Sequence, residues 1–310
     1  MPATDPVASL TAARVVIVAG KGGVGKTTVT AVLARAAAAR GLRVLAVELD
    51  GKPTLAELLR DTGITVRAIS APDALDEYLR EHGLARVAKR LTTTGVIDVV
   101  GTAAPGIDDI VVLGKVKQLE RSGEWDLIVV DGPAAGHAIT FLTAASGLLD
   151  AARGGPVRAQ ATDVLELLGD PERCQVVLVT IAETTPVNEV VETAFALEDR
   201  VGVQLGPVVV NGVDTAADQV PDPDHPDVAA AIAAELAERD RGGSGDAAAL
   251  ADAARFRRAR RALQRAEIER LGGTLPLAQV HVGHLAVAGL TAADIAVLAA
   301  RLDVPAGAAR

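Results

Sequence analysis

Nine residues near the start of the chain have the types and spacing needed to bind phosphate. Residues 20–27 read Gly-Lys-Gly-Gly-Val-Gly-Lys-Thr and fit the pattern G-x-x-x-x-G-K-[ST]. Glycine lacks a Cβ atom, so such a loop can bend tightly and direct its backbone N–H groups at phosphate oxygens. We call residues 20–28 the phosphate loop. The residues expected to bind a nucleotide are Gly20, Gly22, Gly23, Val24, Gly25, Lys26, Thr27 and Thr28.

Two side chains of the phosphate loop carry specific chemistry. Lys26 would place a positive charge on the β- and γ-phosphates of a nucleotide, and the Thr27 hydroxyl can ligate Mg²⁺, which prefers oxygen ligands. The local context supports this reading, since "RVVIVAG" before the loop has the pattern of a strand and "TTVTAVLARAAAARG" after it that of a helix. A helix beginning here adds the positive end of its dipole to the site.

Two aspartates follow apolar runs later in the chain. "LAVELDG" places Asp50, and "DLIVVDG" places Asp131, at the end of a predicted strand. An aspartate in that position orients the shell of Mg²⁺, so we predict Thr27, Asp50 and Asp131 as the metal site. For Asp50 an alternative remains, because aspartate also favours turns for its own reasons.

Composition limits the other classes of function. The chain has 310 residues, of which 49% are hydrophobic but only 2% aromatic, so its core must consist of Ala, Val, Leu and Ile. A net charge of −9 argues against a broad nucleic-acid-binding surface, and no nucleic acid is expected as a partner. With Cys174 as the one cysteine, neither an intrachain disulfide nor a thiolate metal site can form. No signal-peptide pattern is visible, so a cytoplasmic location is expected.

Strand-like and helix-like segments alternate along the chain. This alternation predicts an α/β fold with a doubly wound, mainly parallel sheet that carries its ligand sites along one edge. The predicted strands are Val15–Val18, Arg43–Leu49, Thr65–Ile69, Asp126–Val130, Gln175–Thr180, Pro207–Val210 and one near Leu275–Val280.

The motifs resemble one family of P-loop ATPases. The loop pattern K-G-G-x-G-K-[ST] is similar to the deviant Walker A loop of the MinD/ParA/ArsA class, and "LDGKPTL", "VVDGPAAGH" and "VVVNG" follow it in the order seen in the arsenite-pump ATPase family. That family includes the ATPases that target tail-anchored membrane proteins. The resemblance implies ATP as the nucleotide, Mg²⁺ as its cofactor, and residues 1–310 as a single P-loop ATPase domain.

The resemblance also implies roles for individual residues. Lys21 would cross a dimer interface and touch the phosphates of the partner subunit, although it could also be an ordinary solvated loop lysine. Asp50 would activate the attacking water, and Asn211 would read the adenine. The remaining implied residues are the switch segment that begins at Asp131, with Gly132, Pro133, Gly136 and His137, and the base-lining Pro276 and Leu277. His137 could equally be a structural residue of the helix that follows.

Three departures from the family pattern change what can be expected. Lys52 and Pro53 stand where the first switch usually carries an Ala-His pair, which leaves Asp50 as the candidate base of that segment. One cysteine cannot supply the family's paired-cysteine zinc site at the dimer interface, or the metalloid ligands of arsenite pumps. The chain holds one copy of the loop, so a machine with two sites must be a homodimer or a heterodimer with a related ATPase.

The segments between the predicted strands divide into three kinds. Residues 73–123 and 140–170 are predicted as a helical insertion beside the sheet, with "VIDVV" as its one strand-like run. Residues 212–250 are acidic and rich in turn-forming residues, and are expected to be mobile. The following basic run at 255–270 is read as a solvated helix face, with a lipid or partner patch as the alternative.

We expect an ATPase that dimerises around nucleotide and couples hydrolysis to the handling of a client protein. Membrane-protein targeting is one version, in which association with the membrane is indirect. One alternative is a MinD- or ParA-like positioning ATPase, which would need an amphipathic membrane helix or a basic DNA surface. Another is a nucleotide-locked scaffold that hardly hydrolyses ATP, which the altered first switch suggests.

Overall fold

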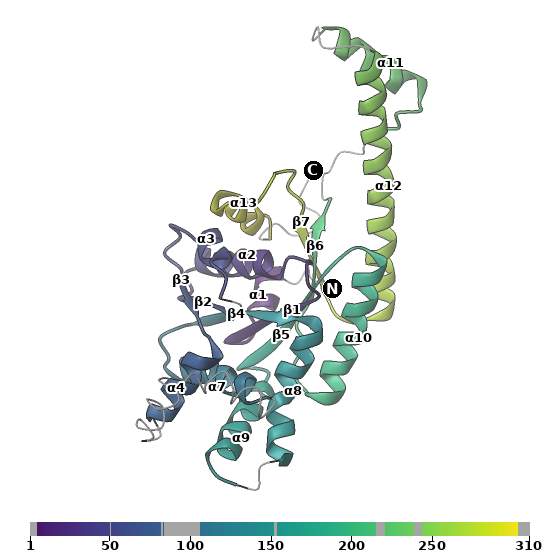
Figure 1. Ribbon diagram of the computed structural model, residues 1–310. Coiled ribbons are helices and arrows are strands. Elements are labelled where there is room, and N and C mark those ends of the chain that lie inside the picture. Colours follow the sequence, from purple (N-terminus) through teal and green to yellow (C-terminus); the bar gives the residue numbers. More distant parts are fainter. Residues whose placement is uncertain are drawn as a thin grey trace.

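The computed structural model describes residues 5–49, 51–81, 83, 106–151, 154–214, 221–238 and 244–302. These residues are organised around a seven-stranded sheet in the order β3-β2-β4-β1-β5-β6-β7 (Figure 1). Every neighbouring pair of strands is parallel. The strands are β1 Val15–Gly20, β2 Val44–Glu48, β3 Thr65–Ala68, β4 Leu127–Ala134, β5 Cys174–Ile181, β6 Val208–Val213 and β7 Gln279–Gly283.

The α/β sheet predicted from the sequence is confirmed, and its strands differ from the predicted ones in extent, most clearly β4, β6, which continues to Val213, and β7. β4 does not end before Asp131 but continues to Ala134, because Asp131 pairs with Val18 of β1 and Ala134 with Gly20. β7 begins at Gln279, near the end of the predicted stretch Leu275–Val280, and continues to Gly283, while Leu275 follows α12 and packs into the core.

Alternation along the central strands separates two hydrophobic cores. Val15 and Ile17 of β1 belong to one buried cluster, and Val16 and Val18 to the other. A strand buried on both faces needs such a continuous apolar run, which is what a parallel sheet covered by helices requires. The helices that border the cluster of Val16 and Val18 are α1 Pro6–Leu10, α2 Lys26–Ala39, α3 Thr54–Leu58 and α13 Ala292–Leu302.

The opposite face of the sheet carries a layer of helices. This layer corresponds to the predicted helical insertion, and its helices pack on one another and on strands β4 and β5. Residues 84–105, with "VIDVV" among them, lie outside the described residues. The helices of this layer are α4 Ala71–Glu81, α7 Ile107–Arg121, α8 Ala135–Ala151 and α9 Pro156–Leu168, and α10 Thr184–Arg200 packs beside α8.

Two further helices form an arm that projects from the body (Figure 1). The helix α12 spans Ser244–Thr274, and α11, Pro226–Glu238, packs against it. The buried residues of α12 are Gln264, Glu267 and Leu271, all in its C-terminal third. The sequence indicated turns for residues 212–250, but α11 occupies part of this segment. Residues 215–220 and 239–243 lie outside the described residues.

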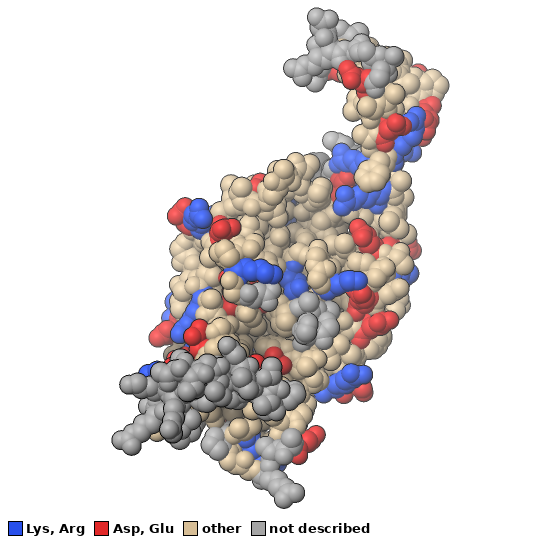
Figure 2. Space-filling view, in the orientation of Figure 1, with Lys and Arg blue, Asp and Glu red and all other residues tan. Residues whose placement is uncertain are grey.

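Three arginines of α12 are paired with aspartates, as expected for a solvated helix face. Arg255 bonds Asp224 at 2.7 Å, Arg257 bonds Asp214 at 2.7 Å, and Arg258 lies 3.3 Å from Asp222. In Figure 2 blue and red atoms accordingly lie side by side along the arm. Exposed pairs of this kind add little stability. Their aspartates do, however, neutralise part of the positive charge that a basic binding patch on α12 would need.

One ion pair at the amino-terminal edge of the sheet is buried. The Glu120 side chain, 3% exposed, accepts a hydrogen bond from Arg173 at 2.7 Å, and Arg14 lies 3.3 Å from it. The pair joins the end of α7 to the segment that enters β5. Because the carboxylate is shielded from water, it depends on these guanidinium groups for its solvation.

We expect Arg173→Met to lower the free energy of unfolding by about 3 kcal/mol, the low end for breaking a buried pair, because Arg14 remains beside Glu120. Urea denaturation measures the change. Arg255→Met is the matched control: Arg255 is in an exposed pair, so its loss should cost less than about 1 kcal/mol. Equal effects of the two substitutions would contradict the assigned role of Glu120.

Candidate nucleotide-binding site

The phosphate loop connects β1 to α2 and leaves the first turn of α2 open to an anion. Gly23 and Gly25 have φ values of 87° and 88°, a region that other residues rarely adopt. Gly25 is the N-cap of α2 and offers no capping side chain, and the first turn holds no acidic residue. Its backbone N–H groups therefore lack the partner that a Ser or Asp cap would supply, and they favour a phosphate instead.

The loop is seated by two close approaches to neighbouring strands. A Cβ atom on Gly20 would lie 2.3 Å from the carbonyl oxygen of Val179 in β5, and one on Gly25 would lie 2.2 Å from Asn211 Nδ2 in β6. Asn211 Nδ2 donates a hydrogen bond of 2.9 Å to the carbonyl oxygen of Val24. Adjacent strands β1, β5 and β6 thus fix the backbone of the loop before any ligand is present.

Asp131 lies against the start of α2, where the sequence placed the metal site. Its carboxylate accepts a hydrogen bond of 2.7 Å from the Thr27 hydroxyl and one of 3.3 Å from the Thr30 hydroxyl. Asp131 is 9% exposed. Thr27 and Asp131 form an oxygen-only donor pair, which fits Mg²⁺ and does not fit a soft metal. The described residues, which do not include Asp50, hold no group of three or more His, Cys, Asp or Glu that could bind a metal.

The two lysines of the loop point in different directions. Lys26 Nζ donates to the carbonyl oxygen of Lys21 at 3.4 Å, so it lies over the loop itself. Lys21 Nζ instead donates to a carboxylate oxygen of Glu189 in α10 at 2.5 Å. The Lys21 side chain is 42% exposed. Lys26 is therefore placed for phosphates bound by its own chain, whereas Lys21 is directed toward the surface.

The structure brings together part of the predicted site. Asn211 and Asp131 lie beside the phosphate loop, while Asp50 is outside the described residues. Gly132 and Pro133 belong to β4, and the backbone of Gly136 and His137 forms the first turn of α8. Pro276 and Leu277 are not brought to the loop. They precede β7, and the amino ends of parallel strands lie at the edge opposite the loop.

Two residues near the loop were not singled out from the sequence. Thr30 could have been found, since it follows Thr27 by three positions and must share its face of α2. Glu189 gave no such signal, because its approach to Lys21 depends on how α10 crosses the sheet.

The sequence is similar to those of known ATPases. A family model described as "Anion-transporting ATPase" matches residues 13–151. The ATPase BagA of Mycobacterium tuberculosis is 33% identical over 65% of this chain and 66% of its own length. Arsenical pump-driving ATPases of Escherichia coli and Acidiphilium multivorum are 30% and 28% identical, each over 66% of this chain. The matched region is 35% of the length of either pump ATPase.

The parallel sheet, the glycine loop at the start of α2 and the Asp131–Thr27 contact define a P-loop nucleotide-binding protein. Within that class, the chain belongs to the arsenite-pump family of ATPases. The predicted family resemblance is confirmed.

We expect Gly25→Ala to weaken binding of MgATP by tenfold or more, because alanine is strained at a φ of 88° and its Cβ would displace Asn211. Isothermal calorimetry measures the affinity. Gly41→Ala is the matched control: Gly41 has a φ of 87°, but a Cβ there meets nothing within 4 Å. It should lower stability similarly while leaving nucleotide affinity intact. Loss of affinity in both variants would mean that strain alone, and not the contact with Asn211, causes the effect.

Proposed function

We propose that this chain hydrolyses ATP as a dimer in which Lys21 of each subunit completes the site of its partner, and that hydrolysis drives the handling of a client protein. The observation that carries the proposal is the 2.7 Å bond between Asp131 and Thr27 at the uncapped start of α2. It joins the metal-binding oxygens to the anion-binding amides in the arrangement that phosphoryl transfer requires.

In this mechanism the backbone of the phosphate loop and Lys26 hold the triphosphate. Thr27 and Asp131 would hold Mg²⁺, which when bound neutralises charge on the phosphate oxygens. Asp50 orients the attacking water and accepts its proton. The ammonium group of the partner's Lys21 offsets the charge that develops on the transferred phosphoryl group. Asn211 reads the base, with ATP preferred over GTP.

The continuity of β4 with α8 supports coupling between the site and the helical layer. Asp131 lies in β4, which ends at Ala134, and α8 begins at the next residue. The segment from Gly132 to His137 therefore contains no slack that could absorb a shift of Asp131. A shift would reach α8, which packs on α7 and α9. Such discrete rearrangements are the usual means of switching in nucleotide-driven proteins.

The chemistry of the chain favours a protein client over a metalloid. Although relatives are named arsenical pump-driving ATPases, Cys174 is buried in the core, and burial raises the pKa of its thiol to about 12. It is therefore not available as a thiolate ligand. The helical layer holds a cavity of about 240 Å³ between α4, α7 and α9, with Tyr78, Lys115 and Gln160 among its lining residues. This polar lining does not favour an apolar membrane helix as the client.

The place of action is proposed to be the cytoplasm, with any membrane contact made through the client or a partner. Among the described residues, no helix combines the length and the apolarity needed to cross a membrane. A homodimer satisfies the proposal, and so does a heterodimer with a related ATPase.

The two loop lysines should separate binding from dimerisation. Lys26→Ala should lose affinity for ATP, because its charge lies over the loop of its own chain. Lys21→Ala should bind ATP nearly as well as the unmodified protein but lose both ATP-driven dimerisation and turnover. Calorimetry and light scattering with ATP measure the two effects. A Lys21 variant that dimerises and hydrolyses ATP normally would disprove the role in trans.

Asp50→Asn tests hydrolysis against the scaffold alternative. The substitution keeps shape and hydrogen bonding but removes the charge that activates water. We therefore expect turnover to fall on the order of a hundredfold, the low end for loss of a general base, while the ATP-bound dimer forms and persists. Single-turnover hydrolysis measures the rates. Equal rates would remove Asp50 from the mechanism, and equal rates near background would favour a nucleotide-locked scaffold.

A further inference from the structure

Lys21, the lysine assigned to the partner's site, is held by a carboxylate of its own chain. Lys21 Nζ lies 2.5 Å from Glu189 Oε1, and among the described residues this is the bond that its ammonium group makes. The other carboxylate oxygen, Glu189 Oε2, is buried and accepts no hydrogen bond from any described residue. A buried carboxylate oxygen without a hydrogen bond is poorly solvated, so the negative charge of Glu189 favours a nearby cation.

The backbone on both sides of this contact is fixed. Lys21 directly follows β1, and Glu189 lies near the start of α10, the helix that follows the adjacent strand β5. Val187 and Val190 bury the opposite face of α10 against the sheet, and the Thr193 hydroxyl bonds the carbonyl oxygen of Glu189. Glu189 therefore presents its carboxylate at a defined point beside the phosphate loop.

The charges around the loop explain why a carboxylate is needed at that point. Two ammonium groups and the positive end of α2 lie close together, and they repel one another when no phosphate is bound. Lys26 turns inward over the loop. Glu189 compensates the second charge and draws Lys21 outward, away from the phosphates of its own chain.

We propose that Glu189 is a positioning residue that holds Lys21 ready for the phosphates of the partner subunit. The inference rests on the proposed dimeric function. An ammonium group has three N–H donors, and the bond to Glu189 uses one of them, which leaves two for phosphate oxygens. A lysine that is already ordered loses less side-chain entropy when the dimer forms. The carboxylate therefore favours the dimer by fixing Lys21 in advance.

Three substitutions of Glu189 distinguish charge from size. Glu189→Gln keeps the size and loses the charge, Glu189→Asp keeps the charge on a shorter stem, and Glu189→Ala loses both. Loss of a half-exposed ion pair changes an equilibrium constant about threefold. A two-fold symmetric dimer contains two such pairs, so we expect the dimer dissociation constant to rise about tenfold for the Gln and Ala variants. Asp should recover most of the loss, because the flexible lysine stem can follow the carboxylate.

Light scattering and sedimentation with ATP measure the dimer, while calorimetry should show unchanged ATP affinity. Glu192→Gln is the matched control, since Glu192 is exposed one turn further along α10. If Glu189 had a purely structural role, the size of the side chain would decide the result. Glu189→Gln would then dimerise like the unmodified protein, and Glu189→Asp would dimerise less well. Either that order, or a Gln variant that dimerises as tightly as or more tightly than the unmodified protein, would overturn the proposal.

A second measurement tests the contact without the dimer. In the nucleotide-free protein, Glu189→Gln should raise the rate of Lys21 labelling by an amine-reactive reagent about threefold, with Lys52 as internal reference. An unchanged rate would overturn the assigned contact. If Lys21→Ala abolishes dimerisation but Glu189→Gln does not alter it, the positioning role alone fails. If Lys21→Ala dimerises normally, the proposed function fails and the positioning role fails with it.

Discussion

A buried carboxylate that must be compensated is the constraint around which this structure is built. Asp131 lies in the interior strand β4, between β1 and β2, where it is largely shielded from water. Hydroxyls of Thr27 and Thr30 at the start of α2 provide hydrogen bonds in place of water. These contacts hold the start of α2, and with it the phosphate loop, against β4. The same contact that satisfies the fold therefore creates the oxygen pair of the site.

The helical layer and the arm are attached to that edge in different ways. The layer is covalently continuous with β4 through α8, so the site and the layer share one segment of backbone. The arm is attached by side chains. Gln264 bonds the carbonyl oxygen of Gly212 and the N–H of Asp214 at the end of β6, and Glu267 bonds the Thr184 hydroxyl after β5.

The sequence predicted those parts of the structure that local patterns determine. β1 and β4 were found because their β-branched runs are buried on both faces, and the phosphate loop because its glycine spacing has a mechanical reason. The sequence did not predict α11, although "VAAAIAAELAE" has high helix propensity. The prolines and aspartates before it are typical of turns, and they indicated a turn-rich segment instead. The resemblance places Pro276 and Leu277 beside the base, but it does not contain the strand order that puts them before β7. Whether a turn precedes or follows its strand decides at which edge it lies, and short apolar motifs do not contain that information.

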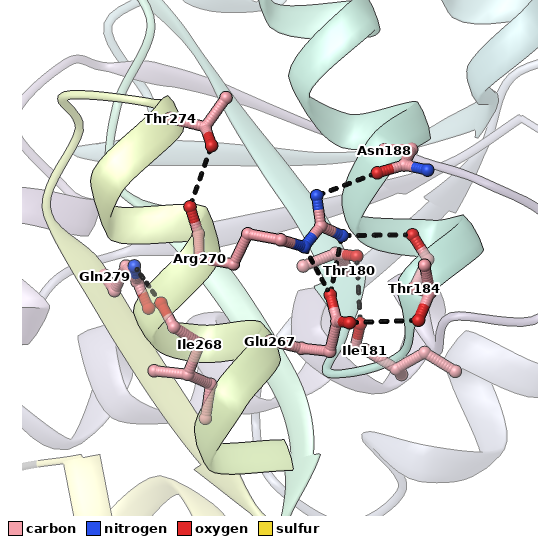
Figure 3. A network of polar contacts seen from close by, with 9 residues as sticks. All are labelled: Thr180, Ile181, Thr184, Asn188, Glu267, Ile268, Arg270, Thr274 and Gln279. Carbon is pink, nitrogen blue, oxygen red and sulfur yellow. Dashed lines mark hydrogen bonds and ion pairs between the residues drawn. The ribbon is translucent and has the colours of Figure 1, made fainter. Parts of the chain in front are cut away.

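The residues that attach the arm to the body lie close to the expected nucleotide site. Arg270 donates to Glu267 and to Asn188 of α10, and the Thr184 hydroxyl also donates to Glu267, as part of the network that Figure 3 shows. Burial opposes ionisation of Glu267, but the bonds from Arg270 and Thr184 outweigh it and lower the pKa of that carboxyl. The charged network therefore persists at neutral pH. Because the anchors lie at the ends of β5 and β6, beside Asn211, a change in the angle of the arm would strain the bonds that join it to the strands seating the loop.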